Sequence, residues 1–108
     1  MELAPRKLLT IVAEQALERR LVEDLERAGV GGYTIVPARG AGARGERPAD
    51  WEQARSIKVE VVCDEATATS LTQRLHDRYF DDFAIVLWTS DVRVLRPDKF
   101  APGSRQAP

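Results

Sequence analysis

The apolar residues of this chain change their spacing in the same order twice, and this repetition limits the fold more than any other feature. Residues 8–13 are all aliphatic or β-branched, which is typical of a strand buried on both faces. Residues 14–28 then switch to helical spacing, and residues 33–36 return to a short β-rich run. The helical stripe consists of Leu17, Leu21, Leu25 and Ala28, and Gly29 is placed to end the helix. The first part of the chain therefore predicts strand, helix, strand.

The same order follows after a long interruption. Residues 57–61 alternate apolar and polar side chains, which indicates a strand with one buried face. Asp64 is a favourable N-cap for a helix over residues 65–80. The run 83–88 is apolar throughout and predicts a last strand, and a weaker alternation over 92–95 predicts a short extension of the sheet.

Two such halves predict an α+β protein with the ferredoxin-like βαββαβ sandwich, in which two helices cover one face of a four-stranded sheet. Right-handed crossovers place both helices on the same face, so the other face is bare. The strands at 8–13 and 83–88 are apolar on both sides, and the last strand of this fold is an edge. Because apolar faces and edges are seldom left in water, the sequence predicts that the chain oligomerises.

Length and composition set the outer limits. The chain has 108 residues, enough for a single domain over 1–108 with a core at about 7–96 and a frayed tail at 97–108. A formal net charge of -1 argues against sequence-independent nucleic-acid binding, which needs many uncompensated cations. A single cysteine, Cys63, excludes an internal disulfide and gives no basis for a cysteine-based zinc site. We expect a cytoplasmic protein with no structural metal, no redox cofactor and no catalytic residue.

The segment between the two halves is the one most suggestive of binding. A loop over about 38–55 is longer than most connections in compact domains. Glycines allow backbone N–H groups to approach a phosphate, and arginines bind it with two parallel hydrogen bonds. No helix follows the glycines, so neither a Rossmann fingerprint nor a P-loop fits. The candidate phosphate ligands are Arg39, Gly40, Gly42, Arg44 and Arg47. Taken alone, the same loop is better explained as a flexible solubilising segment than as a binding site.

Several longer segments of the sequence resemble segments of a known protein family. Residues 32–36 leading into 39–42 resemble the strand that enters the T-loop of PII signalling proteins, and 58–62 resembles the strand that leaves it. The Gly-x-Arg-x-x-Arg spacing of 42–47 and the aromatic run at 79–84 resemble the bicarbonate-transporter regulators and the carboxysome-associated PII-like proteins.

Departures from the nitrogen-regulating members narrow what this resemblance implies. Their loop rich in glycine and lysine before the last strand is replaced by Phe80-Asp81-Asp82-Phe83. The T-loop also lacks the tyrosine that some of them have modified, and Trp51 is its only aromatic residue. Control by uridylylation is therefore not expected.

The resemblance implies a homotrimer that binds an adenine nucleotide (AMP, ADP, ATP or cyclic AMP) in the cleft between subunits, with bicarbonate as a second candidate ligand. It implies a T-loop that contacts a bicarbonate or other anion transporter, with Trp51 in the contact, so that a cytoplasmic protein would reach the membrane through its partner. By resemblance, the nucleotide-binding residues are Thr34, Arg39, Gly40, Gly42, Arg44, Arg47, Lys58, Leu87, Trp88 and, from the neighbouring chain, Arg96.

Two alternatives stay open from the sequence alone. One is a slow nucleotide hydrolase on the same fold, against which no pair of titratable groups stands at catalytic spacing. The other is an oligomeric adaptor whose loop arginines bind no nucleotide. A test of nucleotide binding and turnover distinguishes the nucleotide-binding sensor, the hydrolase and the adaptor.

Overall fold

The computed structural model describes residues 2–40 and 55–100, and it confirms the predicted α+β fold. Four of the residues proposed from the sequence, Gly42, Arg44, Arg47 and Trp51, lie outside the described residues. The elements in chain order are β1 (Ala4–Glu14), η1 (Gln15–Leu17), α1 (Glu18–Arg27), β2 (Thr34–Ala38), β3 (Ser56–Cys63), α2 (Glu65–Tyr79), β4 (Ile85–Val94) and η3 (Pro97–Phe100).

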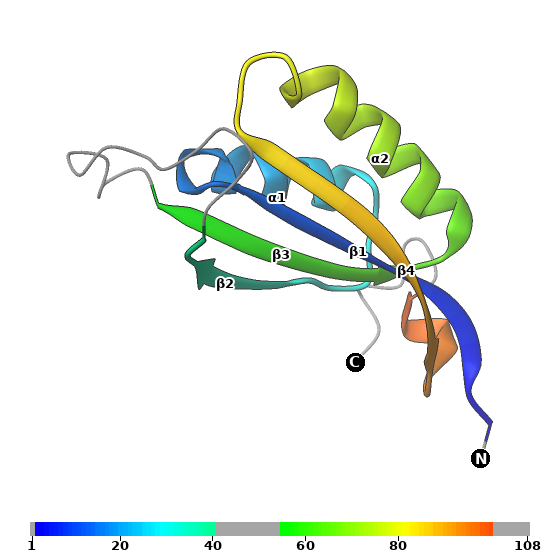
Figure 1. The fold of residues 1–108 in the computed structure, drawn as a ribbon. Coiled ribbons are helices and arrows are strands. Elements are labelled where there is room, and N and C mark those ends of the chain that lie inside the picture. The colour runs from blue at the N-terminus through cyan, green and yellow to red at the C-terminus, as the bar shows by residue number, and fades with distance from the viewer. Residues whose placement is uncertain (1, 41–54, 101–108) are drawn as a thin grey trace.

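The four strands form one sheet in the order β2-β3-β1-β4, and every neighbouring pair is antiparallel. Figure 1 shows α1 and α2 on one side of this sheet. This is the ferredoxin-like arrangement, with β4 at an edge as the sequence predicts. The long loop joins β2 to β3 at one end of the sheet, so its two feet are held by paired strands.

The core fills the space between the sheet and the helices. Alternate strand residues point into it, because successive side chains of a strand face opposite sides. Burying one leucine or isoleucine contributes roughly 1.5–3 kcal/mol, so this layer is the main source of stability. Its largest fully buried members include Leu9 and Ile11 of β1, Val59 and Val61 of β3, Leu21 and Leu25 of α1, and Leu71, Leu75 and Tyr79 of α2.

The first and last strands of the chain differ from the prediction in length. β1 begins at Ala4 instead of Leu8, and β4 runs unbroken from Ile85 to Val94, so the weak extension at 92–95 belongs to the same strand. The two strands pair along this whole length, from Ala4 opposite Val94 to Ala13 opposite Ile85. Backbone pairing therefore continues into polar stretches of both strands, where the sequence shows no alternation of apolar and polar residues. An ion pair between Lys7 and Asp91 supports the polar stretch.

The helix boundaries and the tail also differ in detail. The predicted helix over 14–28 consists of the short 3-10 segment η1 followed by α1, while Gly29 ends it with φ of 73°, as expected of a glycine C-cap. The predicted tail begins with an ordered turn, because Pro97–Phe100 forms η3. The Arg6 guanidinium donates a hydrogen bond of 3.0 Å to the Pro97 carbonyl. The rest of the tail lies outside the described residues.

The face of the sheet opposite the helices, here called the open face, carries exposed apolar side chains. Val36 of β2 and Val86 and Trp88 of β4 are exposed by 39%, 54% and 48%. The pairing places Val86 beside Val12 of β1 on this face. The bare face expected from the sequence is therefore present, and it carries exposed apolar side chains of the kind found at contact surfaces.

No helix among the described residues has the length and apolar character needed to cross a membrane.

Candidate functional site

A groove lies at the foot of the long loop, beside the start of the helix layer. It has a volume of about 800 Å³. Both ends of the loop border it, since Arg39 and Gly40 follow β2 and Arg55 precedes β3. The lining residues are Gln15, Glu18, Ile35, Pro37, Ala38, Arg39, Gly40, Arg55, Ser56 and Ile57.

The chemistry of the groove suits an anion. Arg39 and Arg55 are exposed cations on its two sides, and guanidinium groups bind phosphates and carboxylates with paired hydrogen bonds. A Cβ atom added at Gly40 would meet nothing within 4 Å, so the backbone there is open to a ligand. Among the described lining residues, Glu18 is the one carboxylate. Two of the predicted nucleotide-binding residues, the sequence neighbours Arg39 and Gly40, thus line this groove.

Three further predicted residues lie on the open face. Thr34 of β2 is opposite Glu60, Glu60 is opposite Thr10, and Thr10 is opposite Trp88 of β4. Thr34 and Trp88 therefore occupy the two edges of one row across four strands, roughly 14 Å apart at the usual strand spacing. Lys58, half-buried, lies in the neighbouring row. Within one chain the structure does not bring Thr34 and Trp88 together.

Leu87 lies on the other side of the sheet from Trp88. It pairs with Ile11 and packs, partly buried, against the hydrophobic core beneath the helices. The reason is the two-residue period of a strand, which turns neighbouring side chains to opposite faces. Leu87 and Trp88, named together as a cleft wall from the sequence, thus do not share a wall in this chain.

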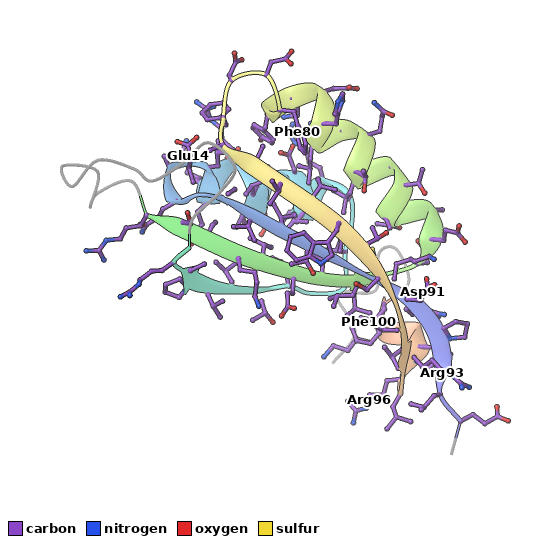
Figure 2. All side chains as sticks on the ribbon, in the orientation of Figure 1. Glu14, Phe80, Asp91, Arg93, Arg96 and Phe100 are labelled. Carbon is purple, nitrogen blue, oxygen red and sulfur yellow. The ribbon has the colours of Figure 1, made fainter. Side chains whose placement is uncertain are left out.

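Arg96 lies far from the groove in the same chain. Figure 2 shows it at the end of the sheet opposite Glu14, which precedes the groove residue Gln15. Its backbone is left-handed, with φ of 56°, a conformation that costs a non-glycine residue about 1–2 kcal/mol. Such strain is retained where the surrounding structure fixes the backbone, and here the Arg96 carbonyl accepts a hydrogen bond of 3.1 Å from the Lys99 amide.

Sequence reasoning missed the groove residues Gln15, Glu18 and Arg55. Gln15 and Arg55 are 40 residues apart in the chain, and the antiparallel pairing of β1 with β3 brings them together. A hydrogen bond of 2.6 Å from the Gln15 amide to the Arg55 carbonyl fixes this contact. No local sequence pattern predicts a contact between residues so far apart in the chain.

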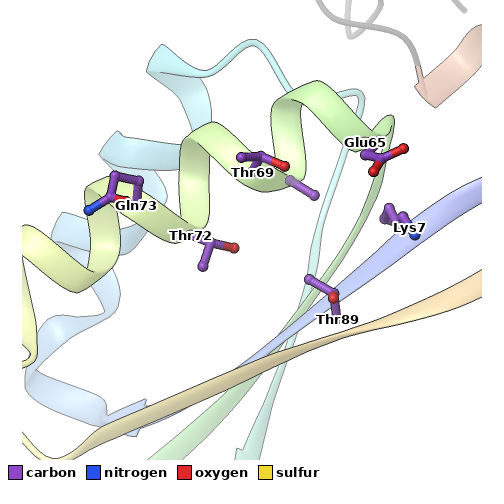
Figure 3. A pocket seen from close by; sticks show the side chains of 7 residues that line it. Lys7, Glu65, Thr69, Thr72, Gln73 and Thr89 are labelled. Carbon is purple, nitrogen blue, oxygen red and sulfur yellow. The ribbon is translucent and has the colours of Figure 1, made fainter.

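A second, smaller groove lies between α2 and β4, with a volume of about 340 Å³ (Figure 3). Hydroxyl and amide groups dominate its described lining, and the one cation there, Lys7, is already paired with Asp91. The lining residues are Lys7, Glu65, Ala68, Thr69, Thr72, Gln73 and Thr89. None of the residues proposed from the sequence is among them.

Cys63 and the acidic residues show no site chemistry in residues 2–40 and 55–100. Burial, reinforced by Asp64, raises the pKa of the buried Cys63 thiol to about 11, which leaves it protonated and unreactive near neutral pH. Within the same residues no group of three or more His, Cys, Asp or Glu is placed to hold a metal ion.

Known proteins share this fold and much of this sequence. The family model described as nitrogen regulatory protein P-II matches residues 6–99. A PII-like signalling protein from Thermus thermophilus is 47% identical, with 93% of this chain and 99% of that chain covered and a TM-score of 0.79.

Two structures of CPII, a protein of Thiomonas intermedia K12, are also similar. The one bound to ADP, AMP and acetate is 30% identical, covers 94% of this chain and 99% of its own, and has a TM-score of 0.82. The one bound to ADP, AMP and bicarbonate is 31% identical over 93% and 97% of the two chains, also with a TM-score of 0.82. With a family model over nearly its whole length and relatives at this level of identity, the chain belongs to the PII family of signalling proteins.

Proposed function

We propose that this protein is a PII-like sensor that binds an adenine nucleotide and changes the contact of its T-loop with a partner protein. The observation that carries the proposal is the CPII relative, which is 31% identical over nearly the whole chain and whose structure holds ADP and AMP. The groove at the foot of the T-loop supports it, because two guanidinium groups and an open glycine backbone suit a phosphate.

The phosphate site is proposed to continue into the T-loop. Arg39 and Gly40 border the groove, and Gly42, Arg44 and Arg47 follow along the chain. In this proposal the glycines border the ribose and phosphates, and the arginines neutralise the phosphate charge. Thr34 hydrogen-bonds near the base.

The site is proposed to form between two subunits of a homotrimer. Thr34 and Trp88 lie at opposite edges of the sheet, and Arg96 lies at the end away from the groove. A cleft that contains all of them needs Thr34 and Lys58 from one chain and Trp88 and Arg96 from the next. The exposed apolar side chains of the open face supply a driving force for this association.

Bicarbonate is proposed as a second ligand, and an inorganic-carbon or other anion transporter as the T-loop partner. The CPII relative bound to bicarbonate supports the first part. The second part rests on the resemblance of residues 42–47 to bicarbonate-transporter regulators, and so does the role of Trp51 in the contact. The closer relationship to the bicarbonate-transporter regulators stays a prediction.

Isothermal titration with AMP, ADP, ATP and cyclic AMP, each with and without bicarbonate, tests the proposal. We expect wild type to bind at least one nucleotide with a Kd on the order of micromolar, and Arg44→Ala to weaken this binding by about tenfold or more. Arg27→Ala, which removes an exposed arginine at the end of α1, is the matched control and is expected to bind normally. Absence of binding to all four overturns the proposal and leaves the nucleotide-free adaptor, whereas release of product from ATP or ADP identifies a hydrolase.

A further inference from the structure

The carboxyl end of β1 is bonded to two different connections of the chain through consecutive residues. The Glu14 side chain accepts a hydrogen bond of 2.7 Å from the Ala84 amide, in the connection between α2 and β4. The next residue, Gln15, donates its amide to the Arg55 carbonyl at 2.6 Å, where the T-loop enters β3. Figure 2 shows Glu14 at this end of the sheet.

The connection that Glu14 holds is itself well fixed to the helices. The amides of Asp82 and Phe83 donate to the Tyr79 carbonyl at 3.3 and 3.0 Å. The Phe83 ring meets the Tyr79 ring edge-on at 6.0 Å, and the Arg20 guanidinium lies 5.8 Å above it. Residues 82–83 therefore move with the helix layer, and the bond from Ala84 joins that layer to β1.

On its other side the same junction forms part of the groove. Gln15 and Arg55 both line it, and Arg55 is the first described residue at the foot of the T-loop that leads into β3. The bonds through Ala84, Glu14, Gln15 and Arg55 thus connect the α2–β4 connection to the foot of the T-loop. A carboxylate that accepts an amide hydrogen bond is a stronger acceptor than a neutral carbonyl, so Glu14 is suited to hold this connection.

We infer that Glu14 is a positioning residue: by holding the Ala84 amide it fixes the β1–η1 junction, and through Gln15 it fixes the foot of the T-loop. The inference that this junction tunes ligand affinity rests on the proposed function. The mechanical part, that the two connections are coupled through Glu14, does not.

Hydrogen exchange of individual amides, followed by NMR, tests the mechanical part without a ligand. In Glu14→Ala we expect the Ala84 amide to exchange about tenfold faster and the Gln15 amide, which is bonded to Arg55, to speed up with it. Glu14→Gln keeps a carbonyl oxygen at the same length and is expected to restore most of the protection of both amides. Asp82→Asn removes an exposed carboxylate from the same connection and should leave both unchanged. Faster exchange at Ala84 alone, with Gln15 as in wild type, overturns the coupling.

Titration with ADP then tests the functional part on the same variants. We expect the Kd of Glu14→Ala to rise about tenfold and that of Glu14→Gln to stay within about threefold of wild type. An equal loss in both variants overturns positioning by the hydrogen bond, because Glu14→Gln keeps an acceptor for the Ala84 amide and removes only the charge. If wild type binds no nucleotide, the proposed function fails while the exchange result still decides the coupling. Should Glu14→Ala not fold, Glu14→Asp, which withdraws the carboxylate by one methylene, replaces it with the same expected results.

Discussion

At the scale of single residues, Asp24 is the polar group most deeply enclosed by the two helices. Its side chain is 1% exposed, and one oxygen accepts a hydrogen bond of 2.5 Å from the Tyr79 hydroxyl. The other oxygen accepts from Arg74 Nε at 2.9 Å. Burial, followed by the hydrogen bond to Asp24, raises the pKa of Tyr79, so the phenol stays protonated as a donor. Asp24 therefore joins α1 to α2 through buried hydrogen bonds, which water does not replace.

We expect Asp24→Ala to lower the free energy of unfolding by about 3 kcal/mol, because it leaves the Tyr79 hydroxyl buried without its acceptor. Urea denaturation at neutral pH and one fixed protein concentration measures this loss. Glu23→Ala is the control, since the neighbouring Glu23 is exposed and its ion pair with Arg19 is long, at 3.9 Å. It should change stability by less than about 0.5 kcal/mol. Equal effects of the two substitutions would contradict the role assigned to Asp24.

At the scale of elements, the start of α2 depends on a single cap. The Asp64 side chain accepts a hydrogen bond of 2.8 Å from the Thr67 amide. The hydrogen bonds from Thr67 lower the pKa of Asp64 below its ordinary value. A carboxyl group whose pKa is lower in the folded state stabilises the protein above its unfolded-state pKa, and this contribution is lost as the pH falls through the folded-state pKa.

We expect Asp64→Ala to cost about 1 kcal/mol at pH 7, the usual value of an N-cap. The difference from wild type should shrink as the pH falls below about 4, because protonation removes the same interaction from wild type. Asp64→Asn keeps an acceptor at the cap and should retain most of the stability at pH 7. Thermal unfolding followed by circular dichroism at pH 7 and pH 3 measures all three proteins. A difference that is the same at both pH values would show that the carboxylate charge is not involved.

The order and type of the elements could be predicted from the sequence because each has its own local signal. Leu21 and Leu25 mark α1, Asp64 marks the start of α2, and alternation marks β3. The lengths of β1 and β4 could not be predicted from apolar spacing, because their added residues are largely polar. Lys7 and Asp91, for example, lie opposite each other in the sheet and form an ion pair.

For the site, the sequence could predict Arg39 and Gly40 as candidate nucleotide-binding residues, because glycine and arginine clusters in a long loop are a local feature. Both line the groove, and their role in binding stays a prediction. It could not supply Gln15 or Arg55, which reach the groove only through the pairing of distant strands. It also could not assign a face to Leu87, because an unbroken apolar run contains no alternation from which to read the faces.

At the scale of the whole molecule, the open face is the surface through which we propose that the chain associates. Trp88 is 48% exposed there, next to the exposed Val86 row, and neither α1 nor α2 covers this side. We expect Trp88→Lys to shift the protein from the proposed trimer toward monomer, because it places a charge in the proposed apolar contact. Sedimentation velocity over a range of concentrations measures the shift. Ser70→Lys introduces the same side chain on an exposed position of α2 and should leave the mass unchanged. An unaltered mass in Trp88→Lys would exclude Trp88 from the interface and contradict the proposed role of this part of the open face.

The strand order has a consequence for how the chain is made. β1 lies in the middle of the sheet, yet both strands that flank it, β3 and β4, come later in the sequence. On the ribosome, β1 and β2 therefore emerge before either has a partner in the sheet. Pairing begins only when residues 56–63 have left the exit tunnel, and the second side of β1 stays open until residues 85–94 follow. A chain halted before that point exposes the backbone edge of β1, its longest strand and the one that contributes Leu9 and Ile11 to the core, to chaperones and to other unfinished chains.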